Sequence, residues 1–201
     1  MTQAPPDDTP RLSVKALQLI SKARILGLPG DPRLPRQARE LFAEADEQRR
    51  QLGNEELLSL VNLPGSQAPL MGLLQSCADD LVAAARSQLL LEQPQLVERG
   101  GALYPGFRAE ACWRDLWHFL RCVLYAGACG LSDFTAPRGL EAMAELYLEL
   151  SVPLDAMVRA LVLLKQNTLA AAGAQGIDVL DQAFDHLIGA LAAFRQRSLE
   201  C

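Results

Sequence analysis

Helical periodicity, with no alternating pattern beside it, is the feature that most constrains this chain. Apolar residues recur at three- and four-residue steps, as Leu74, Cys77 and Leu81 do, which places them on one face of an α-helix. A half-buried strand would instead show apolar residues at every second position, and no stretch of the sequence does. The sequence therefore predicts an all-α fold, and its 201 residues are enough for one domain with its own core.

Candidate caps and turn-rich breaks divide the chain into separate helices. Ser13, Thr135 and Ser151 are candidate N-caps, and Pro- and Gly-containing stretches at 26–35 and 62–69 predict breaks. The expected helices span residues 13–26, 37–52, 70–93, 108–127, 135–150, 152–172 and 177–197. Their number is compatible with a globin-like arrangement.

Charge and composition exclude several classes of function. The net charge is −5 and the arginines are scattered singly apart from Arg49 and Arg50, which argues against nucleic acid as a partner. No apolar run approaches the roughly 20 residues that a membrane span needs. The acidic, Pro-rich N-terminus resembles neither a secretory signal nor a transit peptide, and we expect residues 1–12 to form a disordered tail.

The sequence gives little indication of a metal site, a disulfide framework or a haem site. Five cysteines without CxxC spacing argue against a disulfide framework or a zinc site and favour reduced thiols in the cytoplasm. A haem globin would need a proximal histidine, but nothing around His118 or His186 indicates iron ligation. Asp178, Asp181 and Asp185 next to His186 could form a carboxylate metal site, although a solvated acidic face is the preferred interpretation.

The stretch EACWRDLWHFLR, residues 110–121, is chemically the most unusual. On a helix, Arg108 lies one turn before Cys112, Asp115 lies one turn after it, and Arg114 flanks the same patch. A thiol can add to a vinyl or ethylidene group, a carboxylate can accept hydrogen bonds from pyrrole N–H groups, and arginines can hold propionates. The patch suits a linear tetrapyrrole; the alternative is a buried cysteine beside an intrahelical Arg–Asp pair.

These residues belong to a longer pattern that resembles the phycobiliproteins, in particular the allophycocyanin-like subunits of phycobilisome cores. The family typically reads P-G-G-N-A-Y-G and then C-L-R-D-M-x-Y-Y-L-R, and this chain reads RGGALYPG at 99–106 and CWRDLWHFLR at 112–121. Its ELYLELSVP at 145–153 is similar to the family's Y-x-x-L-G-V-P segment. The resemblance covers residues 70–195.

The resemblance implies a globin-like phycobiliprotein fold with an N-terminal helical hairpin extension. Residues 13–69 would form the extension and residues 70–201 the bilin-binding core, together making one structural domain. It also implies a role in light absorption or excitation transfer within a phycobilisome or related assembly, and no enzymatic activity. The expected partners are other phycobiliprotein subunits and linker proteins in an oligomer, in the cytoplasm against the cytoplasmic face of the photosynthetic membrane.

The resemblance further assigns roles to individual residues. Cys112 would carry one open-chain tetrapyrrole, most similar to phycocyanobilin, through a thioether bond. The aspartate that matches Asp115 bonds the two central pyrrole nitrogens, the arginines that match Arg108 and Arg114 hold propionates, and the tyrosine that matches Tyr147 contacts the pigment. No cysteine occurs between residues 166 and 188, where some relatives attach a second pigment, so we expect only one.

Several positions depart from the family pattern. The family has an N-terminal aspartate that pairs with the partner subunit's arginine, the one matching Arg121, and the nearest stretch here, residues 21–29, lacks it. His118 and Phe119 replace paired tyrosines, and Glu110 brings a negative charge near the thiol, where it could oppose propionate binding. Two alternatives therefore stay open: a chromophore-free assembly, scaffold or regulatory protein, and a bilin carrier or photosensor.

Overall fold

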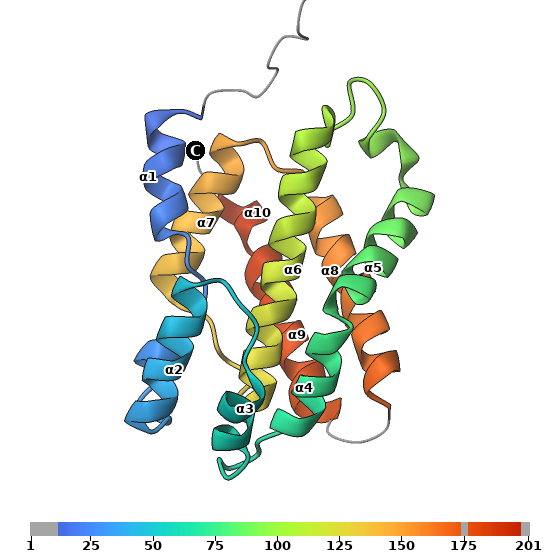
Figure 1. The fold of residues 1–201 in the computed structure, drawn as a ribbon. Helices are drawn as coiled ribbons and strands as arrows, with labels where there is room; N and C mark the ends of the chain where they lie inside the picture. Colours follow the sequence, from blue (N-terminus) through green and yellow to red (C-terminus); the bar gives the residue numbers. More distant parts are fainter. Residues whose placement is uncertain (1–11, 174–176, 198–201) are drawn as a thin grey trace, which may run out of the picture.

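A central helix, α6 (Gly106–Ala128), organises the molecule (Figure 1). The structure is a computed structural model that describes residues 12–173 and 177–197. Nearly every residue in the second half of α6 is buried, because other helices surround it. The helices that pack against it are α4 (Ala68–Ser76), α5 (Ala78–Glu92), α8 (Leu154–Ala172) and α9 (Ile177–Ala192).

The N-terminal segment lies against one side of this core. Helix α1 (Val14–Lys22) packs along α7 (Pro137–Glu149), as Figure 1 shows at its left edge. Ser13 caps α1 as predicted, because its side chain accepts a hydrogen bond from the Ala16 N–H. A 3₁₀ turn (Leu28–Gly30) leads into α2 (Arg36–Glu47). Helix α2 buries a stripe of Ala38, Phe42 and Ala45 against the core.

Backbone hydrogen bonds fasten this segment to the start of α7. The Gly27 N–H donates to the Phe134 carbonyl over 2.7 Å, and the Ala136 N–H donates to the Ile25 carbonyl over 2.7 Å. One isolated antiparallel bridge, between Leu26 and Thr135, results. The all-α prediction is confirmed, since the described residues contain helices, turns and this bridge but no β-strand.

The prediction of a single helix over residues 70–93 is wrong. The helix breaks at Cys77, whose backbone (φ −113°, ψ 16°) is not helical and whose thiol donates to the Leu74 carbonyl over 3.3 Å. A helix that we did not expect, α3 (Asn54–Leu60), lies between the predicted helix over 37–52 and the predicted break at 62–69. The carboxylate of Glu56 caps the N-terminus of α3, because it accepts a hydrogen bond from the Gly53 N–H over 2.7 Å.

Two of the three residues predicted as N-caps, Thr135 and Ser151, do not cap a helix. Helix α7 follows Ala136, while the Thr135 hydroxyl bonds the His186 Nε2 over 2.7 Å. Helix α8 follows Pro153, and Ser151 lies in the turn before it with φ 50°. The last predicted helix ends at Ala192 and is followed by a short one, α10 (Phe194–Arg197). Residues 1–11 of the predicted tail lie outside the described residues.

No helix within the described ranges combines the length and the apolar character that crossing a membrane requires.

Candidate ligand-binding site

A cavity of about 320 Å³ lies between α6, α7 and the N-terminal segment. Its walls are mostly apolar, with Phe107, Phe119, Leu146 and Val152 among them. Cys112, Asp115 and Phe119 of α6 all face this cavity. All five residues that we predicted from the sequence line it together: Arg108, Cys112, Arg114, Asp115 and Tyr147.

Asp115 and Tyr147 form the polar centre of the cavity. The Tyr147 hydroxyl donates to Asp115 Oδ2 over 3.1 Å, and this bond joins α6 to α7. Burial raises the pKa of the Asp115 carboxyl, which the hydrogen bond from Tyr147 partly opposes. Burial and then the nearby Asp115 raise the pKa of Tyr147 well above its ordinary value. Asp115 is therefore a half-buried acceptor whose charge calls for further hydrogen-bond donors.

Cys112 presents a protonated thiol at neutral pH. Burial, followed by the nearby Asp115 carboxylate, raises its pKa to about 12, although the charges of Arg108 and Arg114 act in the opposite direction. The residue is 5% exposed, so reagents from bulk solvent reach it poorly. A ligand that is already bound in the cavity has better access to this sulfur than a free one.

The two predicted propionate-binding arginines have different surroundings. Arg108 donates from Nε to the Ala102 carbonyl over 3.0 Å, and from Nη2 to the carbonyls of Leu150 and Ser151 over 3.1 and 2.8 Å. Much of its hydrogen-bonding capacity therefore holds two turns together. Arg114 is exposed and makes no hydrogen bond or ion pair within the described part of the chain, so its guanidinium is available to a ligand.

The far end of the cavity holds a second polar group, formed by His118, Arg121 and Asp46. Arg121 is 4% exposed and donates from Nη2 to Asp46 Oδ1 over 2.7 Å and from Nη1 to the Tyr125 hydroxyl over 3.1 Å. Burial, together with the charge of Arg121, lowers the pKa of His118 to about 4. The buried Nδ1 of His118 and Nε of Arg121 have no hydrogen-bond partner among the described residues.

One wall of the cavity was not predicted from the sequence. It comes from the N-terminal segment, and no motif marks it. The residues that form it are Leu12, Ile20, Ala23, Arg24, Ile25, Asp46 and Arg49. The doublet formed by Arg49 and Arg50, the only adjacent arginines in the chain, is the one signal that could have drawn attention to it.

Glu110 and Trp113 lie on the opposite face of α6. Arg86 forms an ion pair with Glu110 over 3.6 Å and stacks over the Trp113 ring at 5.4 Å. Neither Glu110 nor Trp113 lines the cavity; both line a second pocket, which Arg114 also lines. Trp117 donates to Asp79 over 2.9 Å and helps to pack α6 against α5.

The acidic face of α9 is exposed to solvent, as the preferred interpretation had it, with the side chains of Asp181 and Asp185 43% and 62% exposed. Lys165 on α8 bonds Asp181 and Asp185 over 2.8 and 2.5 Å. These carboxylates are therefore paired with a cation of the chain itself.

Comparisons with known proteins agree with this architecture. A family model described as phycobilisome protein matches residues 40–191. The chain is 34% identical to allophycocyanin subunit beta-18 of Porphyra purpurea over 123 residues, which cover 60% of this chain and 73% of that protein. It is 32% identical to the C-phycocyanin-3 beta subunit of Microchaete diplosiphon over 136 residues, which cover 66% of this chain and 79% of that protein.

A solved structure shows the same likeness in three dimensions. It is a far-red fluorescent biliprotein derived from a far-red induced allophycocyanin F subunit of Chroococcidiopsis thermalis, with a TM-score of 0.56 and 31% identity. The match covers 62% of this chain and 94% of that one. The chain therefore belongs to the phycobilisome protein family and has its globin-like, all-α fold.

Proposed function

We propose that this chain binds one open-chain tetrapyrrole through a thioether bond to Cys112 and uses it to absorb light and transfer excitation. The observation that carries the proposal is the shared cavity, in which Cys112, Arg114, Asp115 and Tyr147 meet on α6 and α7. No bond of a substrate is made or broken in this role, so the chain would not be an enzyme.

The donors and acceptors of the cavity fit such a ligand. Asp115 is a half-buried carboxylate with one bond from Tyr147, and pyrrole N–H groups would supply further donors to it. Arg114 is available for a propionate, and the apolar walls suit the flat conjugated rings. Held extended between these contacts, a bilin would lose less excitation to torsion than it does in water.

The attachment chemistry balances without a further reactant. The Cys112 sulfur would add to a vinyl or ethylidene carbon of the ligand, and its proton would end on the neighbouring carbon. Because the pKa of this thiol is raised to about 12, only a small fraction is thiolate at neutral pH. Attachment would therefore be slow without an attaching enzyme or a base in the cavity.

Family membership suggests the setting in which this would happen. The relatives are named as subunits of allophycocyanin and phycocyanin, and assembly with other phycobiliprotein subunits and linkers at the cytoplasmic face of a photosynthetic membrane is the corresponding proposal. One observation favours a second candidate, a single-subunit bilin carrier or photosensor. Arg121, whose family equivalent pairs with a partner subunit, here pairs with Asp46 of its own chain.

The test is the intact mass and the acid-urea absorption spectrum of the protein purified from its native host. We expect a mass increase of one bilin, which Cys112→Ser abolishes. Cys122→Ser is the matched control, because Cys122 is a second thiol on the same cavity, and it should keep the pigment. An unmodified wild-type mass would overturn the proposal, and so would pigment that survives in Cys112→Ser and is lost in Cys122→Ser.

The spectrum of the native protein separates the two candidates. Strong fluorescence without photoconversion is the result expected for excitation transfer. Reversible photoconversion under alternating illumination would instead establish the photosensor.

A further inference from the structure

The cavity carries an unusual excess of positive charge. Its lining contains five arginines and two aspartates, which leaves three positive charges in excess in a chain whose net charge is −5. No lysine or glutamate lines it. Such a cavity favours an anionic ligand, because each unpaired guanidinium is stabilised by a carboxylate.

Three of the five arginines already have partners within the protein. Arg24 forms an ion pair with Glu47 over 2.5 Å, Arg121 forms one with Asp46 over 2.7 Å, and Arg108 bonds three backbone carbonyls. The guanidinium groups of the remaining two, Arg49 and Arg114, make no hydrogen bond or ion pair within the described ranges. They are exposed and come from different elements of the chain.

Arg49 occupies a turn that does not by itself call for an arginine. It follows α2 and has φ 52°, a left-handed conformation that usually selects glycine or asparagine at a helix C-terminus. The Arg49 and Arg50 N–H groups close the turn on the carbonyls of Asp46 and Ala45, both over 3.1 Å. The turn explains the backbone of Arg49 and leaves the choice of side chain unexplained.

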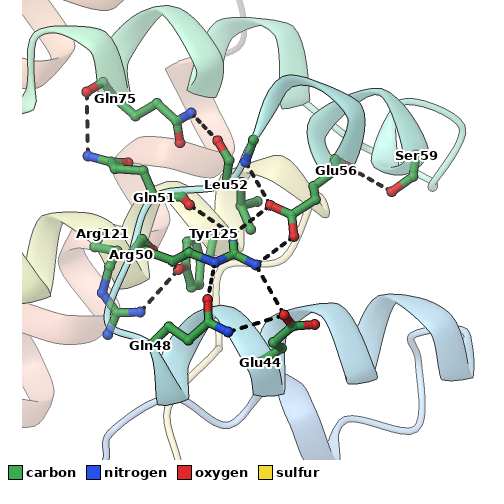
Figure 2. Close-up of polar contacts among 11 residues, drawn as sticks. Glu44, Gln48, Arg50, Gln51, Leu52, Glu56, Ser59, Gln75, Arg121 and Tyr125 are labelled. Carbon is green, nitrogen blue, oxygen red and sulfur yellow. Dashed lines mark hydrogen bonds and ion pairs between the residues drawn. The ribbon is translucent and has the colours of Figure 1, made fainter.

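The turn is held firmly in place beside the cavity. Arg50 bonds Glu56 with both Nη atoms, each over 2.7 Å, and Gln48 with Nε over 2.7 Å (Figure 2). The Tyr125 hydroxyl donates to the Arg50 carbonyl, which ties the turn to α6. Arg49 is also close enough to Asp115 and His118, which line the cavity, for its charge to lower the pKa of both.

We propose that Arg49 binds one carboxylate of the ligand while Arg114 binds the other, so that the N-terminal segment is part of the binding site. This inference rests on the proposed function, in which the ligand is a linear tetrapyrrole with two propionate groups. It assigns to Arg49 a role that the motif around Cys112 does not contain. Two unpaired guanidiniums match two propionates in number and in charge.

The test compares a ligand that has carboxylates with one that does not. In a Cys112→Ser background, which keeps binding non-covalent, the full chain is titrated with phycocyanobilin and with its dimethyl ester, and quenching of Trp113 and Trp117 fluorescence gives the two Kd values. Arg49→Asn removes the charge and tolerates the left-handed backbone. Arg36→Asn is the control, because Arg36 is an exposed arginine of α2 that does not line the cavity.

We expect the background protein to prefer the diacid over the diester. Arg49→Asn should reduce this preference about fivefold, the effect of one partly exposed ion pair. Arg49→Lys should restore most of it, and Arg36→Asn should leave it unchanged.

Two results would overturn the inference while leaving the proposed function intact. One is that Arg49→Asn prefers the diacid over the diester as strongly as Arg36→Asn does. The other is that Arg49→Asn lowers the affinity for the diacid and for the diester equally, which would indicate a structural role for the turn. If neither ligand binds the background protein, the proposed function fails and this inference fails with it.

Discussion

Arg121 on α6 and Asp46 on α2 form an ion pair of 2.7 Å inside the protein, with the arginine side chain 4% exposed and the aspartate side chain 13% exposed. The pair joins the N-terminal segment to the central helix across 75 residues of sequence. A guanidinium buried to this extent requires a carboxylate, because an unpaired buried charge is strongly destabilising.

Asp46→Asn should therefore lower the free energy of unfolding by about 2 kcal/mol. The reason is that Arg121 keeps its charge and loses its carboxylate. Urea unfolding followed by far-UV circular dichroism measures the change. Glu47→Gln is the control, since Glu47 is adjacent and its ion pair with Arg24 is at the surface; its midpoint should stay near that of the wild type. Equal midpoints for both variants would contradict the buried-pair explanation.

Gly139 permits the close contact between α7 and the N-terminal segment. A Cβ atom at this position would overlap the carbonyl oxygen of Arg24, so Gly139→Ala should destabilise the protein by about 2 kcal/mol or more. Gly189→Ala is the matched control, because Gly189 is also helical and a Cβ there would meet nothing within 4 Å. That change should stabilise the protein by about 0.5–1 kcal/mol. Thermal unfolding of both variants should thus shift in opposite directions.

Tyr147→Phe should weaken the polar centre of the cavity. The loss of the hydroxyl removes the donor to Asp115, so the pKa of Asp115 should rise further and the unfolding free energy should fall by about 1 kcal/mol. If the proposed bilin is bound, its fluorescence yield should decrease in this variant, because Asp115 is then held less firmly. Tyr104→Phe changes an exposed tyrosine and should alter neither quantity; a fluorescence loss in that variant would refute the assignment.

His118 should make stability fall as the pH decreases from about 6.5 to 4. Burial and the charge of Arg121 lower its pKa to about 4, while a histidine in the unfolded chain titrates near 6.5. Between these values the unfolded chain binds more protons, so protonation favours unfolding. His118→Gln should flatten this part of the profile, which urea unfolding at a series of pH values would show.

Asp115 acts in the opposite direction at pH values just above the ordinary pKa of a carboxyl group. Its raised pKa means that the unfolded chain loses this proton first as the pH increases, so its contribution to stability falls with rising pH. Both proteins contain Asp115, so its contribution cancels when the pH profile of the unfolding free energy of His118→Gln is subtracted from that of the wild type. Identical profiles for the two proteins would rule out His118 as the titrating group.

Cys112 should be slow to react in the pigment-free protein. Its pKa of about 12 and its burial predict that iodoacetamide alkylates it at least about tenfold more slowly than the half-buried Cys77 at neutral pH. Peptide mapping by mass spectrometry at timed intervals gives both rates in one sample. Faster labelling of Cys112 than of Cys77 would show that the cavity activates the thiol.

Much of the core was predictable because its helices carry a clear apolar periodicity. The prediction for α6 differed from the observed helix by two residues at its start and one at its end, since Gly106–Ala128 replaces 108–127. The five predicted site residues were found around one cavity because three of them share a face of that helix. The helix break at Cys77 was missed because no glycine or proline marks it; the thiol there bonds the Leu74 carbonyl of the preceding turn.

The N-terminal wall could not be predicted for a physical reason. Its contacts depend on backbone carbonyls, on the absence of a side chain at Gly139 and on pairs that are far apart in sequence, such as Asp46 and Arg121. None of these leaves a periodic or spaced pattern. The predicted helix over 37–52 correctly indicated α2, but its charges gave no sign that Asp46 would be turned inward.

The attachment of the N-terminal segment to α7 also has a consequence for the order of folding. Arg33 and Asp133, which pair across this junction over 2.8 Å, are 100 residues apart in sequence, and such distant contacts form late. During synthesis, residues 12–50 leave the ribosome long before the helix on which they rest exists. We therefore expect a stage of folding in which α6 is formed while the side of the cavity that the N-terminal segment closes is still open.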